Sequence, residues 1–256
     1  LPEDILLLSF GADTQDNGFY YMFLGWCFGL VIKILKHGFI YCDVREQQYK
    51  DPANVFVKFY NEITMEKMMW QDNTEAWFSS GFIDRGGHRS RDVDYICSKI
   101  PNLHAYVGLS KPDPKQPLFY ESQNGPFYLG QTESISEITG MIIDSPDFFI
   151  PDDYHPELCR QLARQYFIKK TSPDGTEVIK WIHGGDDHFR DCLNLGYIAG
   201  IKKGFDKILL NKQACELIYK NRNQLKNKKS GEQAHQQQQN NTNNPRSIYD
   251  QVLKGR

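Results

Sequence analysis

The first 42 residues contain three apolar segments joined by very short turns, and this arrangement constrains the fold more than any other feature of the chain. Apolar residues run over 5–10 and 19–30, and the Asp-Asn-Gly sequence at 16–18 between them is typical of a tight hairpin turn. A third apolar segment, 30–42, is interrupted at 36–38, where a strand could bulge. We therefore predict three consecutive antiparallel strands.

The pattern then changes to alternating helices and strands. A helix is predicted to begin at Pro52, since proline is tolerated in the first helical turn and apolar residues then recur at helical spacing. Segments 76–84 and 103–109 are strand-like, and 93–100 between them is helical. The order β-β-β-α-β-α-β over 1–109 predicts an α/β, ribonuclease H-like fold, in which helices flank a mixed sheet of a three-stranded antiparallel meander plus parallel strands.

The second half of the chain is less regular. Residues 110–154 contain many prolines and predict an insertion of loops and a hairpin. Apolar residues from 158 to 166 predict a helix, and 171–175 predicts a turn between two short strands. A last helix is predicted over 187–201. Three small residues would let it lie close against the sheet: Gly196, Ala199 and Gly200.

Charge and composition change near the C-terminus. Residues 201–256 carry twelve Lys/Arg against four Asp/Glu, whereas 1–200 carry 18 against 28. The end of the chain is rich in Asn and Gln, which bury too little apolar surface to fold. We predict a ribonuclease H-like domain over 1–205, an amphipathic helix over 206–224, and a mostly disordered basic tail over 225–256.

Several functional classes are excluded by what the sequence lacks. No apolar run is long enough for a membrane-spanning helix, and neither a phosphate-binding P-loop nor a dinucleotide-binding glycine motif occurs. The six cysteines are scattered without a Cys-x-x-Cys pair, so we expect buried thiols rather than disulfides or a structural zinc site. The chain begins with Leu1, and we expect it to be part of a longer polypeptide.

Four aspartates are the candidates for chemistry. Asp13 and Asp84 are each predicted to end a buried strand, and the carboxyl ends of neighbouring parallel strands lie at the same end of a sheet. Asp187 and Asp191 are four residues apart, so they share one face of the last helix. Carboxylates brought together in this way repel each other unless a cation lies between them, and oxygen ligands suit Mg²⁺ or Mn²⁺.

Each aspartate also has a simpler explanation. An aspartate after a strand is often a turn former, and Asp187 at a helix start is often an N-cap. The combination of all four nevertheless matches the requirements of two-metal phosphodiester hydrolysis. We predict that Asp13, Asp84, Asp191 and Asp187 are catalytic residues that hold two Mg²⁺ or Mn²⁺ ions. His183 and His188 are interpreted as surface or supporting residues rather than zinc ligands.

Three motifs in this order resemble a known family. The segments GADTQD at 11–16, IDRGGHR at 83–89 and RDCLN at 190–194 resemble the C-terminal nuclease domain of the large terminase subunit of tailed bacteriophages, the lambda-like branch in particular. The resemblance extends over about residues 1–205. It implies a ribonuclease H-like endonuclease that cuts concatemeric viral DNA during packaging.

The resemblance also implies site residues and partners. The family's first acid falls on Asp13, its second on Asp84 and its third on Asp191, with Asp187 competing for that third position. The implied partners are double-stranded DNA, the packaging ATPase domain upstream in the full chain, the small terminase subunit and the portal. The implied location is the host cell cytoplasm, with no membrane involvement.

Two other interpretations remain open from the sequence. The first is a Holliday-junction resolvase or transposase-type nuclease on the same fold, and the second is a non-catalytic docking module. The basic segment after residue 201 is expected to supply non-specific DNA affinity, which truncation after Ile201 would test. Alternatively, apolar residues such as Phe205 and Leu209 pack this segment on the body and its lysines are merely solvated.

Overall fold

The computed structural model of the chain describes residues 1–65, 67–70, 73–109, 115–152, 154–171, 175 and 177–221. Leu1–Glu216 forms one compact unit, and Leu217–Arg256 forms a second, which is described only as far as residue 221. The predicted disordered tail lies outside the described residues, and the domain boundaries at 205 and 224 stay predictions. No helix in the described part of the chain is long and apolar enough to cross a bilayer.

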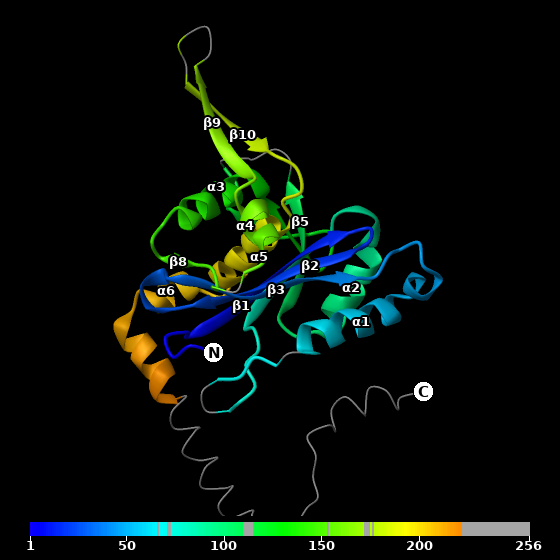
Figure 1. Cartoon of the computed structure of the whole chain (residues 1–256), viewed down its shortest axis with the longest axis horizontal. Coiled ribbons are helices and arrows are strands. Elements are labelled where there is room, and N and C mark those ends of the chain that lie inside the picture. The colour runs from blue at the N-terminus through cyan, green and yellow to red at the C-terminus, as the bar shows by residue number, and fades with distance from the viewer. Residues whose placement is uncertain are drawn as a thin grey trace, which may run out of the picture. The chain divides into compact units, whose positions relative to one another are not determined.

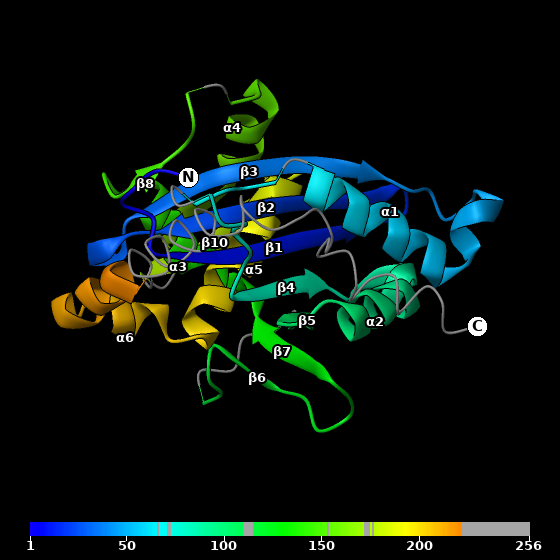
Figure 2. The same cartoon turned by 90° about the horizontal axis from the view of Figure 1, so that it is seen from below.

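The core of the first unit is an eight-stranded mixed sheet (Figure 1), whose strand order is β6-β7-β5-β4-β1-β2-β3-β8 (Figure 2). The strands are β1 (Leu7–Gln15), β2 (Gly18–Trp26), β3 (Ile32–Tyr41), β4 (Ser80–Asp84), β5 (Leu103–Leu109), β6 (Phe119–Glu121), β7 (Phe127–Gln131) and β8 (Phe148–Phe149). Strands β1, β2 and β3 form an antiparallel meander, and β4, β5 and β7 continue the sheet in parallel with β1. The fold is ribonuclease H-like, and the predicted fold class is confirmed.

Helices cover both faces of this sheet (Figure 2). They are α1 (Pro52–Met65), α2 (Ser90–Lys99), α3 (Thr132–Ile143), α4 (Pro156–Leu162), α5 (His188–Lys202) and α6 (Phe205–Leu209). Helices α1 and α2 pack on one face, and α5, supported by α3 and α4, packs on the other. Residues 212–221 are also helical.

Successive side chains of β1 point alternately to the two faces of the sheet. Phe10 and Ala12 point into the core beneath α1 and α2, whereas Gly11 and Asp13 point to α5. The contact with α5 is so close that a Cβ on Gly11 would lie 2.0 Å from the carbonyl oxygen of Cys192. The predicted close approach of this helix to the sheet is therefore present, and it places the first turn of α5 beside Asp13.

The predicted boundaries differ from the structure in the meander. We expected Asp13 to end the first strand, but β1 continues to Gln15 because its pairing with β2 extends to the turn. The irregularity expected at 36–38 lies one residue earlier, since Leu35 is skipped where the register between β2 and β3 shifts.

The region 110–154 is more structured than the expected loops and hairpin. Strands β6 and β7 do form an antiparallel pair, but β7 also joins the main sheet beside β5. The segment further contains α3, whose short apolar pattern is interrupted by polar residues and was missed. Tyr166, expected in a helix, lies in β9 (Gln165–Thr171), which pairs with β10 (Glu177–His183). Most of the turn expected at 171–175 lies outside the described residues.

The first part of the basic segment belongs to the core. Phe205 and Leu209 are 1% and 0% exposed, and the Phe205 ring centroid lies 5.5 Å from that of Trp26. The alternative in which these apolar residues pack on the body is therefore correct for α6. Truncation after Ile201 would remove core residues, so a test of DNA affinity requires truncation after residue 221 instead.

Replacement of Phe205 by alanine should lower the free energy of unfolding by about 3–5 kcal/mol, because it leaves a cavity against Trp26. Urea denaturation measures this change. The matched control is Leu210→Ala, since Leu210 is 65% exposed and its loss should change stability by less than about 0.5 kcal/mol. Equal effects of the two substitutions would contradict the placement of α6.

Candidate functional site

Three of the four predicted aspartates line one pocket of about 160 Å³: Asp13 from β1, Asp84 from β4 and Asp191 from α5. Strands β1 and β4 are parallel neighbours, and Ala12 pairs with Ile83, so the next residue of each strand is one of the two acids. Asp191 lies in the first turn of α5. The topology of the fold thus brings together acids that are far apart in the sequence.

Asp13 is the least solvent-exposed of these acids, at 5%. Its Oδ2 accepts a hydrogen bond of 2.8 Å from Gln15 Nε2 and lies 2.8 Å from Nδ1 of His188. Burial lowers the pKa of His188, but the hydrogen bond and the charge of Asp13 outweigh burial and leave the pKa above its usual value. His188 therefore contacts Asp13 directly, and this contact restricts the orientation of the Asp13 carboxylate.

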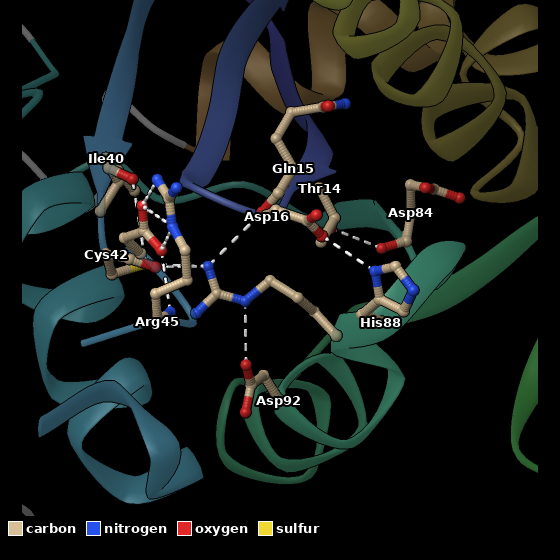
Figure 3. A network of polar contacts seen from close by, with 11 residues as sticks. Thr14, Gln15, Asp16, Ile40, Cys42, Arg45, Asp84, His88 and Asp92 are labelled. Carbon is tan, nitrogen blue, oxygen red and sulfur yellow. Dashed lines mark hydrogen bonds and ion pairs between the residues drawn. The ribbon is translucent and has the colours of Figure 1, made fainter. Parts of the chain in front are cut away.

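Asp84 is the last residue of β4, as predicted. Burial and the nearby charge of Asp13 raise its pKa to about 6, against the lowering effect of hydrogen bonds from the backbone amides of Gly86 and Arg85. The Thr14 hydroxyl donates a 2.6 Å hydrogen bond to the carbonyl of Asp84, which ties the ends of β1 and β4 together (Figure 3).

A buried arginine anchors the loop that follows Asp84. Arg89 is 1% exposed, and its Nε donates to Asp92 Oδ2 at 2.9 Å while Nη1 donates to the carbonyl of Cys42 at 2.6 Å. Close by, Asp16 and His88 approach to 3.2 Å across the same loop (Figure 3). These contacts join the end of β3 to α2 and hold the exit of β4 in place. Sequence reasoning missed the role of Arg89, because its contact with Cys42 spans 47 residues of the chain.

Asp187 does not line the pocket formed by the other three acids, but one side chain links it to Asp191. Gln165 Nε2 donates to Asp187 Oδ2 at 2.8 Å and to Asp191 Oδ1 at 3.1 Å. Asp187 occupies the N-cap position of α5, yet its carboxylate accepts from Gln165 rather than from the helix. Burial, followed by the charges of Asp13 and Asp187, raises the pKa of Asp191 well above its usual value.

The segment that carries Gln165 also holds the start of α5. The side-chain oxygen of Gln161 accepts from the Phe189 amide at 2.9 Å, and Arg164 Nη1 donates to the carbonyl of Asp186 at 3.0 Å. The sequence did not indicate that Gln161 and Arg164 hold the start of α5, because its apolar spacing predicted only a helix over 158–166. Gln165 is 6% exposed, and its Oε1 is buried without a partner among the described residues.

All six cysteines are free thiols. Four of them are buried, as expected, whereas Cys97 and Cys159 are only half-buried. The side chain of His183 lies outside the described residues.

The pKa of Asp84 predicts how pH affects the protein without metal. Because the pKa is about 6 in the folded protein and 3.8 in a model peptide, the folded state binds more protons between these values. Stability should therefore fall as pH rises through this window. We expect the unfolding free energy of the wild type, relative to Asp84→Asn, to be about 2 kcal/mol lower at pH 7.5 than at pH 4. Urea denaturation in EDTA tests this, and a difference that does not change with pH would contradict it.

The donor atoms of the pocket suit a hard divalent cation. Carboxylate oxygens are the preferred ligands of Mg²⁺ and Mn²⁺, and a cation would offset the repulsion that raises the pKa of Asp84 and Asp191. Among the described residues, however, no three His, Cys, Asp or Glu side chains are already grouped as a metal site. Binding an ion between these acids would therefore require their side chains to rearrange.

Comparison with known proteins gave two similar structures. No family model matches the sequence, and no curated protein matches it. The chain is similar to two crystal structures of the large terminase nuclease from thermophilic phage G20c, the second with bound magnesium. Sequence identity is 14% and 12%, TM-scores are 0.39 and 0.40, and the alignments cover 75% of this chain and 81% and 80% of those chains. Similarity this low says nothing about activity by itself, so function is inferred from the site.

Proposed function

We propose that this chain is the metal-dependent DNA endonuclease domain of a viral genome-packaging terminase and cuts concatemeric double-stranded DNA by two-metal hydrolysis. One observation carries the nuclease proposal. Acids from the central strands β1 and β4 and from α5 line a single pocket in a ribonuclease H-like fold. Burial together with the repulsion between these acids raises the pKa of Asp84 and Asp191. The sequence motifs at 11–16, 83–89 and 190–194 support the narrower assignment to the lambda-like terminases.

Each side chain has a proposed role. Asp13, Asp84 and Asp191 hold the ions, and Asp187 is an auxiliary ligand or positions the base. Bound divalent ions supply a water of lowered pKa and neutralise charge on the phosphate and the leaving oxygen. His188 orients Asp13 through their 2.8 Å contact.

The partners are proposed on the sequence motifs alone. They are double-stranded DNA, a packaging ATPase domain in the same full-length chain, the small terminase subunit and the portal. The proposed location is the host cell cytoplasm.

A plasmid-nicking assay tests the activity. Purified protein with Mn²⁺ or Mg²⁺ should nick supercoiled plasmid with little sequence preference, and EDTA should stop the reaction. Supercoiled plasmid that stays intact with both metals would contradict the proposal. Cleavage of a four-way junction but not of plain duplex would replace it with the junction resolvase interpretation.

Gln165 provides a test of how the acids are held. Gln165→Leu removes the amide that links Asp187 and Asp191, so both carboxylates lose a fixed orientation and their repulsion increases. We expect Mn²⁺ affinity, measured by calorimetry, to fall about 10- to 100-fold, as is typical for loss of a residue that orients metal ligands. Gln47→Leu is the control, since Gln47 is exposed and does not line the pocket of the three acids. Unchanged Mn²⁺ affinity in Gln165→Leu would show that the amide only packs the site.

A further inference from the structure

A row of side chains crosses the sheet at the level of the candidate acids. Asp84 on β4 and Asp13 on β1 are followed on β2 by Tyr20, which pairs with Asp13, and on β3 by Phe39, which pairs with Tyr20. The row lies on the face covered by α5, since Tyr20 stacks on the ring of His188 with centroids 4.5 Å apart. The acidic pocket thus continues sideways into an aromatic surface.

Phe39 is the accessible end of this row. Its side chain is 37% exposed, and its ring centroid lies 4.6 Å from that of Tyr20. Among the described residues, β8 pairs with β3 only at Ile32 and Lys33, so no strand lies beside Phe39. A Cβ on Gly18 would lie 2.8 Å from the Phe39 ring, which shows that this ring lies directly on the turn between β1 and β2. Phe39 therefore offers an aromatic ring that is supported on one side and open on another.

Phe39 is close enough to the acids for the base of a nucleotide near the cut to reach it. Adjacent strands lie about 4.8 Å apart, so Phe39 is about 10 Å across the sheet from Asp13. A DNA strand cut at Asp13 would place the nucleotide next to the cut over this surface. His188 connects the two regions physically, because it stacks on Tyr20 and contacts Asp13.

The charges around the row favour a base over a phosphate. Asp13, Asp186 and Asp187 all lie near His188, and Asp13 and Asp186 also act on Tyr20. A phosphate approaching this surface would be repelled, whereas a base has a neutral π face. Stacking of bases on aromatic side chains needs no particular base sequence.

We propose that Phe39 and Tyr20 form an aromatic shelf that stacks the base of an unpaired nucleotide next to the bond that is cut. This inference rests on the proposed nuclease function. It specifies the substrate of that site further: the enzyme favours DNA whose strands are separated beside the cut. The shelf also predicts measurable affinity for single-stranded DNA in the absence of metal.

Fluorescence of 2-aminopurine in a short single-stranded oligonucleotide tests the shelf, because stacking on an aromatic ring quenches it. In EDTA, the wild type should bind and quench the probe, and Phe39→Ala should weaken binding about tenfold. Phe39→Trp keeps a stacking ring and should retain both binding and quenching. Phe28→Ala is the matched control, since Phe28 is 53% exposed beyond the far end of β2 and should behave as the wild type.

The possible results separate this inference from the proposed function. If Phe39→Ala binds and quenches the probe as the wild type does, or if the wild type does not bind it, the shelf is wrong. The nuclease proposal is judged separately by nicking of plasmid by the wild type with Mn²⁺. Circular dichroism should show that Phe39→Ala is folded, because the residue is exposed at the sheet edge.

Discussion

Asp84→Asn should reduce metal-dependent nicking of plasmid DNA by at least about a thousandfold. The substitution keeps the shape of the side chain but removes one negative charge from the pocket that Asp13 and Asp191 share. A catalytic cation contributes several kcal/mol of transition-state stabilisation, and each 1.36 kcal/mol lost is a factor of ten in rate. Asp13→Asn should have an effect of the same order, because the charge of Asp13 acts on both Asp84 and Asp191.

Both variants should stay folded. Burial and the charge of Asp13 already disfavour the ionised form of Asp84, so removing its charge relieves repulsion in the protein without metal. Asp94→Asn is the matched control, since Asp94 forms an exposed ion pair with Arg85 and should keep nearly full activity. Nicking by Asp84→Asn within tenfold of the wild type would remove Asp84 from the catalytic residues.

Gly11→Ala should destabilise the protein by at least about 3 kcal/mol. The added methyl would lie 2.0 Å from the carbonyl oxygen of Cys192 and 2.5 Å from the amide nitrogen of Gly196, and both are backbone atoms that cannot turn away. Overpacking typically costs about 1–3 kcal/mol, and we expect the upper end or more here because helix α5 as a whole would have to move off β1. Because α5 carries Asp191 and His188, nicking activity should fall as well.

Thermal and urea denaturation measure this loss of stability. Gly29→Ala is the comparison, because it measures the cost of backbone strain without a steric clash. Gly29 has φ +77° with nothing near its added Cβ, so its substitution tests only the cost of a positive φ, about 1–2 kcal/mol. A Gly11→Ala variant as stable as the wild type would contradict the close packing of α5 on β1. A loss in Gly11→Ala no larger than that in Gly29→Ala would mean that the contact with α5 costs no more than about 1–2 kcal/mol, contrary to the expected value.

The parts of the fold that local patterns specify could be predicted from the sequence. The meander follows from apolar segments with short turns, and Asp84 ends its strand because Gly86 and Gly87 break the pattern directly after it. The close packing of α5 was also predictable, since Gly196 and Gly200 leave no side chain between helix and sheet. These features depend on residues close together in the chain.

The features that depend on tertiary contacts could not be predicted. Gln165 links Asp187 to Asp191 from a segment 22 and 26 residues earlier, and its sequence context suggested only a helix. Arg89 reaches Cys42 across 47 residues. Strand β7 gains its place in the sheet from pairing with β5, which no local pattern indicated. The sequence thus pointed to three acids that line one pocket, whereas the contacts of Gln165 and Arg89 required the structure.

The position of bound Mn²⁺ tests the central claim most directly. Crystals of the wild type soaked in Mn²⁺ should show anomalous density in contact with carboxylates of Asp13, Asp84 and Asp191, and Asp84→Asn crystals should lose some or all of it. The same data would establish whether Asp187 is an auxiliary ligand. Full soaking with no anomalous density in this pocket, or density confined to other parts of the chain, would contradict the proposed metal-dependent nuclease site.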